Sequence, residues 1–105
     1  MGKRTREAVR VAKKYVKRLA ENRIRVDKAY VFGSYVYGVP QEGSDIDVVV
    51  VSRQFRTRSI RDYLRLARAR RGVDLRISAL PYYPKDFTDE YTIPYEAMTK
   101  GIRIA

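Results

Sequence analysis

The segment Ile46–Val51 constrains the fold more than any other part of the chain. Its sequence, Ile-Asp-Val-Val-Val-Val, is rich in β-branched residues, which favours a strand buried in a sheet. Asp45 and Asp47 flank the first residue of this strand. Because side chains alternate between the two faces of a strand, both carboxylates are expected on one face. Two carboxylates at such a short separation repel each other unless a cation lies between them. A divalent metal ion is the usual cation.

The Gly-Ser pair upstream of these carboxylates is the second notable feature. A short strand is predicted over residues 26–32, and Gly33 and Ser34 end it. Ser34 is a suitable N-cap for a helical turn that continues to Tyr37. Unpaired backbone N–H groups at such a turn suit a phosphate. A Gly-Ser turn alone is equally compatible with an ordinary tight turn, so the phosphate interpretation depends on the nearby carboxylates.

The rest of the chain alternates between helical and extended patterns. Apolar residues at three- and four-residue spacing predict a helix over residues 4–22 and another that begins after Ser59. Ser59 and Asp62 form a pair of the capping-box kind, and Gly72 supplies the stop. The predicted buried stripe of this helix consists of Ile60, Tyr63, Leu64 and Ala67. Further elements are predicted over residues 73–78 (strand), 93–100 (helix) and 102–105 (edge strand).

A strand, a capped helix and another strand suggest a βαβ-like unit. The expected fold is therefore α/β (α+β), a small mixed sheet with helices packed on one face, in one domain over residues 1–105. If strand 73–78 neighbours Ile46–Val51, Asp74 can come onto the same face as Asp45 and Asp47. Three carboxylates would then converge. The alternative for Asp74 is an ion pair with Arg76 or another arginine, because an unpaired aspartate on an apolar strand is costly.

Composition excludes several kinds of chemistry. The chain has no cysteine and no histidine, so disulfides, thiolate sites and histidine bases are impossible. Catalysis would have to use carboxylates, hydroxyls, Lys, Arg or a hard metal ion. No apolar run approaches the roughly 20 residues of a membrane span, and a cytoplasmic protein is expected. The net charge of +11 favours an anionic partner such as RNA or a nucleotide, or simply forms a solvated basic surface.

Two surfaces have both a structural and a binding interpretation. The first helix carries a cationic side that either binds nucleic acid or only keeps the helix solvated. Its cations are Arg10, Lys13, Lys14, Lys17 and Arg18. The C-terminal loops carry tyrosines that either stack on a base or pack against this domain or a protein partner. These are Tyr82, Tyr83, Tyr91 and Tyr95.

Taken together, the Gly-Ser turn, a further glycine, the Asp-x-Asp pair and a later aspartate resemble the polymerase-β-like nucleotidyltransferase superfamily. The residues that carry this resemblance are Gly33, Ser34, Gly38, Ser44, Asp45, Asp47 and Asp74. The compact length is most similar to the minimal nucleotidyltransferase (MNT) proteins, which occur as antitoxin partners of HEPN-domain toxins. The resemblance spans roughly residues 26–78.

The resemblance implies roles only for the matching residues. Asp45, Asp47 and Asp74 would be the catalytic carboxylates and would hold two Mg²⁺ ions, with Mn²⁺ as an alternative. Gly33 and Ser34 would bind the triphosphate of ATP, and Ser44 would shape the loop before the first aspartate. Many minimal members have an arginine just before the second glycine, where this chain has Tyr37. Another cation, such as Arg53 or Arg76, would have to replace that arginine, or activity would be reduced.

Three functions remain open at the level of sequence. The first is a Mg²⁺-dependent enzyme that transfers AMP from ATP to a hydroxyl, a tyrosine of a partner HEPN toxin, in a complex with that partner. The second is a non-catalytic antitoxin or binding module that neutralises its partner by contact alone. The third is a basic RNA-binding protein that also transfers nucleotides to RNA ends.

Overall fold

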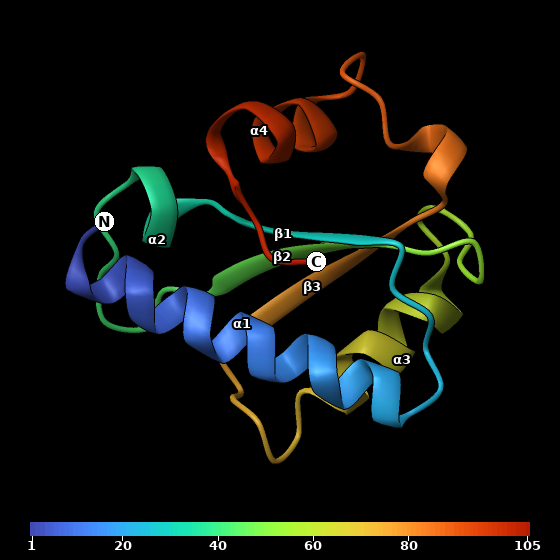
Figure 1. Cartoon of the computed structure of the whole chain (residues 1–105), viewed down its shortest axis with the longest axis horizontal. Coiled ribbons are helices and arrows are strands. Elements are labelled where there is room, and N and C mark those ends of the chain that lie inside the picture. Colours follow the sequence, from blue (N-terminus) through green and yellow to red (C-terminus); the bar gives the residue numbers. More distant parts are fainter.

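The computed structural model describes residues 1–105 and has a four-stranded sheet at its centre (Figure 1). In chain order the elements are α1 (Lys3–Glu21), β1 (Lys28–Phe32), α2 (Ser34–Tyr37), β2 (Ile46–Val51), α3 (Ile60–Ala69), β3 (Ile77–Tyr82), the 3₁₀ helix η1 (Pro84–Asp86), α4 (Thr92–Lys100) and β4 (Ile102–Arg103). The strand order across the sheet is β3-β2-β1-β4.

The sheet is mixed, as predicted. Strands β2 and β3 are parallel, whereas β1 is antiparallel to both β2 and β4. Helix α3 connects the parallel pair, which is the crossover that parallel neighbours require. The α/β (α+β) class and the βαβ-like unit are therefore confirmed, and β2 has the predicted bounds.

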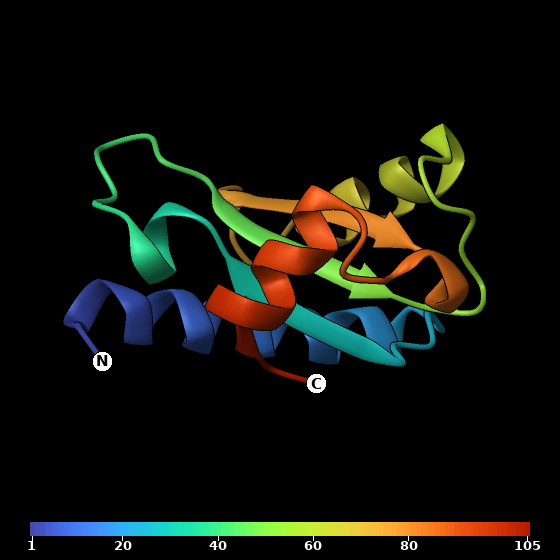
Figure 2. The same cartoon turned by 90° about the horizontal axis from the view of Figure 1, so that it is seen from above.

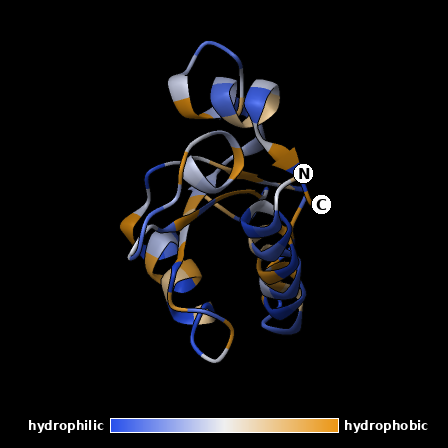
Figure 3. Cartoon of the chain, turned by 90° about the vertical axis from the view of Figure 1, so that its left-hand side faces the viewer, coloured by the Kyte–Doolittle hydropathy of each residue, from blue (hydrophilic) through white to orange (hydrophobic).

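Helices cover both faces of the sheet. Ile46, Val48 and Val50 of β2 pack in the larger core with α1 and α3, whereas Val49 and Val51 pack in a smaller core that includes Ala97 of α4. In Figure 3, α4 lies above the sheet, and α1 and α3 lie below it. Figure 2 shows α4 crossing over β1. The prediction that helices pack on one face thus holds for α1 and α3 but not for α4.

Helix α1 has the amphipathic pattern that was predicted from the sequence. Its buried residues are Ala8, Val11, Ala12, Tyr15 and Leu19. The Tyr15 hydroxyl donates a hydrogen bond of 2.6 Å to the carbonyl oxygen of Leu66 in α3. This bond joins the two helices below the sheet, and burial raises the pKa of Tyr15.

Helix α3 begins as predicted but buries a different face. The Ser59 hydroxyl accepts a hydrogen bond of 3.3 Å from the backbone N–H of Asp62, so the capping interaction is present. The buried residues of α3, however, are Asp62, Leu66 and Ala69. The predicted buried stripe is wrong at its first position, where Ile60 is 76% exposed, and Tyr63 and Leu64 are also exposed. Asp62 is turned inward because its carboxylate accepts a hydrogen bond from the backbone N–H of Arg56.

Strand β3 begins later than predicted. Residues 73–78 alternate cleanly in polarity, but the observed strand is Ile77–Tyr82, which contains Pro81. A proline is tolerated there because β3 is an edge strand. Asp74 consequently lies in the turn before the strand rather than within it. No helix combines the length and the apolar character needed to cross a lipid bilayer.

Candidate active site

The turn at Gly33 joins the end of β1 to the start of α2. Gly33 has φ of 82° and ψ of −158°, a region that is essentially restricted to glycine. A side chain here would overlap the carboxylate of Asp47, because a Cβ atom at residue 33 would lie 3.1 Å from the Cγ atom of Asp47 and closer still to one of its oxygens. Phe32 and Asp47 are paired in the β1–β2 register. The backbone turn and the carboxylate are therefore in direct contact only because residue 33 has no side chain.

Asp45 and Asp47 lie at the start of β2. Ile46 between them is buried in the core beneath the sheet, so the two carboxylates share the opposite face. Asp45 is exposed and Asp47 is half-buried. Burial raises the pKa of Asp47, and the negative charge of Asp45 raises that pKa further. Neither carboxylate has a cationic partner within the chain.

The two predicted serines have different environments. The Ser44 hydroxyl accepts a hydrogen bond of 2.8 Å from the backbone N–H of Gln41, and it closes the loop that leads to Asp45. Ser34 is the first residue of α2, where the first backbone N–H groups of a helix have no intrahelical partner. Ser44 is thus bonded within its own loop, whereas Ser34 lies at the start of a helix.

The structure does not bring Asp74 to the other two aspartates. Its carboxylate accepts hydrogen bonds of 3.0 and 2.8 Å from the Nε and Nη2 atoms of Arg76. These bonds lower the pKa of Asp74. Arg76 also contacts Glu7 of α1 at 3.0 Å, and no group of three His, Cys, Asp or Glu side chains is placed to hold a metal ion. The predicted convergence of three carboxylates is therefore absent, because Asp74 lies in the turn before β3.

Arg53 and Arg76 were the candidates to replace the arginine that many minimal members have at the position of Tyr37. Neither of them is available at this site. Arg53 follows the far end of β2 and lies 3.6 Å from Asp27, while Arg76 is engaged with Asp74 and Glu7.

Helix α4 contributes residues to this region that sequence reasoning missed. The Tyr37 hydroxyl donates a hydrogen bond of 2.9 Å to Glu96. The ammonium group of Lys100 lies 5.7 Å from the centre of the Tyr37 ring. Glu96 and Lys100 are more than about 60 positions from the Gly-Ser turn in the sequence. No local pattern indicated that α4 would fold over α2.

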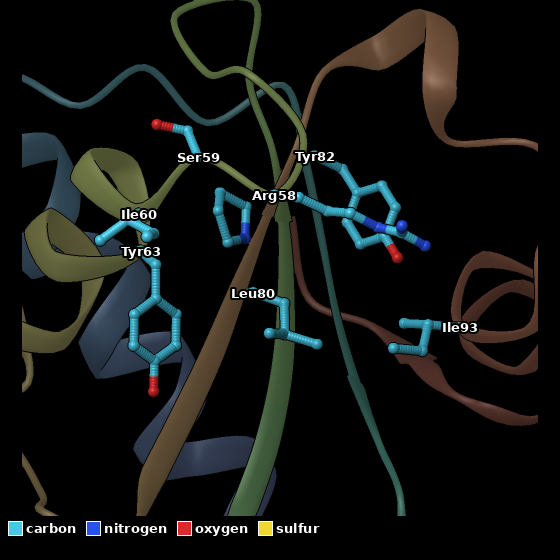
Figure 4. A pocket seen from close by; sticks show the side chains of 8 residues that line it. Arg58, Ser59, Ile60, Tyr63, Leu80, Tyr82 and Ile93 are labelled. Atoms are coloured by element: carbon cyan, nitrogen blue, oxygen red, sulfur yellow. The ribbon is translucent and has the colours of Figure 1, made fainter.

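An apolar groove of about 300 Å³ lies on the same face of the sheet as Asp47. Figure 4 shows Ile60 and Tyr63 of α3 on one side of it, Leu80 and Tyr82 along β3, and Ile93 of α4 on the other side. Leu80 is paired with Val49, two residues along β2 from Asp47. The exposed apolar residues of α3 therefore border a groove on this face of the sheet, and neither Asp45 nor Asp47 lines it.

Comparisons with known proteins agree with this geometry. The profile of a family described as "Nucleotidyltransferase domain" matches residues 9–99. A search of curated proteins gave no match. A candidate nucleotidyltransferase from Sulfolobus solfataricus has a similar structure, with a TM-score of 0.63 and 18% identity over 98% of this chain and 87% of that chain.

Two toxin–antitoxin structures are also similar in fold. A mutant of the toxin–antitoxin MntA–HpeT has a TM-score of 0.61 and 21% identity over 88% of this chain and 70% of that one. A toxin–antitoxin with AMP-PNP has a TM-score of 0.62 and 21% identity over 89% of this chain and 72% of that one. The matched profile covers the Gly33 turn, Asp45, Asp47 and nearly all of α4. The chain therefore belongs to the nucleotidyltransferase domain family.

Proposed function

We propose that this chain is an antitoxin enzyme that transfers AMP from ATP to a hydroxyl group, a tyrosine of a partner HEPN toxin. The observation that carries the proposal is the contact between the Gly33 turn and the carboxylate of Asp47, with Asp45 beside it. Family membership supports nucleotidyl transfer. The similar toxin–antitoxin structures, one of them with AMP-PNP, support a toxin partner and an adenine nucleotide.

The residues present fit a magnesium–nucleotide complex. Mg²⁺ is usually held by one or two carboxylates together with phosphate oxygens of the substrate, and Asp45 and Asp47 supply two carboxylates without cationic partners. Mn²⁺ accepts the same oxygen ligands. When bound, two such ions would stabilise charge on the attacking and leaving oxygens. Asp74 can join this site as the third carboxylate only after Arg76 releases it.

The transfer is a single displacement at phosphorus. The acceptor oxygen forms a bond to the α-phosphorus of ATP, and the bond from that phosphorus to the pyrophosphate oxygen breaks. The hydroxyl proton would pass to a carboxylate of the site, since the chain has no histidine to serve as the base. Gly33 and Ser34 would bind the phosphates through the turn and the start of α2. Ser44 would keep the loop before Asp45 in place through its bond to Gln41.

The apolar groove supports a protein acceptor. It is bordered by Ile60 and Tyr63, which are exposed although α3 has other residues in the core. Contiguous exposed apolar surface is typical of a docking site for a protein. The partner would bring the acceptor tyrosine to the carboxylates from this side of the sheet.

The test is transfer from ATP labelled at the α-phosphate, with Mg²⁺ and a purified HEPN partner. Asp45→Asn and Asp47→Asn should reduce labelling by more than the roughly 10- to 100-fold that loss of an outer-shell residue costs at a metal site. Asp89→Asn is the matched control, because Asp89 is exposed and has no ion pair. Equal labelling by all three variants would refute a metal-dependent mechanism. Neutralisation of the toxin by unlabelled complexes would instead support the non-catalytic antitoxin.

A second candidate function is RNA binding, and the cationic side of α1 favours it. Figure 3 shows hydrophilic residues along the outer side of this helix. The exposed cations without an ion pair on α1 are Lys3, Arg4, Arg6, Arg10, Lys13, Lys14, Lys17 and Arg18. The affinity for single-stranded RNA should fall as the salt concentration rises. The slope of log affinity against log salt concentration should be smaller when Lys13 and Lys17 are changed to glutamine. A dissociation constant above roughly 10⁻⁴ M at moderate salt would indicate no more than nonspecific attraction.

A further inference from the structure

The end of α4 brings Lys100 to the ring of Tyr37, the last residue of α2. Strand β4 pairs with β1 in antiparallel register, with Ile102 opposite Val31. Gly101 and Lys100 directly precede Ile102, and Lys100 is the last residue of α4. Gly101 allows the close approach, because a Cβ atom at this position would lie 2.7 Å from the carbonyl oxygen of Val31. In Figure 1 the C-terminal end of α4 accordingly lies on the same side of the molecule as α2.

The ring of Tyr37 holds the ammonium group of Lys100 above α2. The Tyr37 backbone N–H donates a hydrogen bond of 3.1 Å to the carbonyl oxygen of Gly33, and its hydroxyl donates to Glu96 at 2.9 Å. The side chain of Tyr37 therefore extends from α2 to α4, where its hydroxyl is bound. The ammonium nitrogen lies 5.7 Å from the ring centre, a cation–π arrangement.

Lys100 is a cation without an ion-pair partner, and it lies beside Tyr37, four residues after Gly33. Asp45 and Asp47 have no cationic partner, and Lys100 forms no ion pair. A triphosphate bound at the Gly33 turn would add further negative charge. Arg76 is already engaged with Asp74 and Glu7, so it is not free to neutralise that charge.

We propose that Lys100 binds the phosphate groups of the nucleotide and that the Tyr37 ring positions its ammonium group before the nucleotide arrives. This inference rests on the proposed nucleotidyl transfer and adds a binding residue to it. Lysine suits the task because its ammonium is a compact charge on a flexible stem with three donors. It can leave the face of the ring for a phosphate oxygen without any movement of the backbone.

A purely structural role for Lys100 makes a different prediction. A cation in the last turn of a helix also interacts favourably with the helix dipole, so Lys100 could simply stabilise α4. In that case its removal would lower the thermal stability but would leave nucleotide affinity unchanged. The two roles therefore separate when unfolding and binding are measured on the same variants.

The experiment compares Lys100→Met, Lys100→Arg and the control Lys85→Met by calorimetric titration with Mg²⁺ and ATP, ADP or AMP. Lys85 is also an exposed lysine and lies in η1. Lys100→Met should weaken ATP binding by about tenfold or more, as expected for loss of a charged hydrogen bond, and should weaken AMP binding less. Lys100→Arg should largely retain ATP affinity, and Lys85→Met should match the unaltered chain.

Each result has a distinct meaning. Unchanged ATP affinity in Lys100→Met, with binding intact in the unaltered chain, would overturn the role of Lys100 and leave the proposed function standing. Equal losses in Lys100→Met and Lys100→Arg would also overturn it, since the positive charge would not be the cause. Failure of the unaltered chain to bind Mg²⁺–ATP would refute the proposed function itself, and the inference with it. Thermal unfolding of all variants shows whether a loss of binding reflects a loss of folded protein.

Discussion

The carboxylate of Asp47 occupies the space that a side chain at Gly33 would need. The two residues belong to different segments of the sheet region, and the turn after β1 is thereby tied to the start of β2. The glycine serves two purposes, because its backbone conformation is closed to other residues and its missing side chain admits the carboxylate.

Gly33→Ala should therefore reduce both stability and nucleotide binding. Gly43→Ala is a matched control, since Gly43 also has a positive φ, of 84°, but nothing lies near its missing side chain. Each variant should lose about 1–3 kcal/mol of unfolding free energy from the backbone alone. Only Gly33→Ala should also lose Mg²⁺–ATP affinity, because it displaces Asp47. Denaturant unfolding and calorimetric titration check the two effects, and equal affinities in both variants would contradict this account.

Asp74→Asn should have a smaller effect on transfer than Asp47→Asn. In the structure Asp74 is bound by Arg76, whose side chain is 37% exposed, so loss of the pair should cost at most about 1 kcal/mol of stability. Labelling assays and urea unfolding measure both quantities, and the Asp74→Asn/Arg76→Met double-mutant cycle isolates the ion pair. A loss of transfer as large as that of Asp47→Asn would mean that Asp74 leaves Arg76 to join the metal site.

Asp27→Asn should lower stability in a pH-dependent way. A hydrogen bond from the backbone N–H of Arg53, at 2.9 Å, lowers the pKa of Asp27, and the side chain of Arg25 contributes as well. Because the folded pKa lies below the unfolded one, the stabilisation is complete above the unfolded pKa of about 3.9. It is lost as the pH falls through the folded pKa. The difference in unfolding free energy between the unaltered chain and Asp27→Asn, measured by urea unfolding, should thus be constant near neutral pH and should disappear at acid pH. A difference that grew in acid would contradict this prediction.

Ile60→Glu should weaken docking of the protein partner without weakening nucleotide binding. Ile60 is 76% exposed and borders the apolar groove, so a charge there should leave the fold and Mg²⁺–ATP binding intact. Labelling of the protein partner should fall by about tenfold or more if the residue is central to the interface. Leu75→Glu provides the control, because Leu75 is 70% exposed and is not a lining residue of the groove. Equal labelling by both variants would exclude the groove as the docking site.

Much of the framework was accessible from local sequence. The β-branched run predicted β2 with its correct bounds, and the apolar spacing predicted α1 to within one residue at each end. The capping pair predicted the start of α3. These features depend on propensities and hydrogen bonds between residues a few positions apart, which the sequence contains directly.

The errors share one physical origin. Residues 73–78 alternate like a strand, but the strand that pairs with β2 begins at Ile77, because the register of the sheet is decided by packing against a neighbour. In α3, Asp62 is turned inward by the backbone N–H of Arg56, and Ile60 is left exposed. A helical pattern indicates that one face is buried, but which face it is depends on what lies opposite.

The sequence by itself determined that a buried strand begins between two aspartates and that a Gly-Ser turn precedes it, since both are properties of adjacent residues. Only the tertiary structure decided that Asp47 fills the space beside Gly33, that Arg76 takes Asp74, and that α4 brings Lys100 over Tyr37. Such contacts join segments from separate parts of the chain. Their geometry follows from the register of the sheet and the packing of helices on its two faces, which no local pattern specifies.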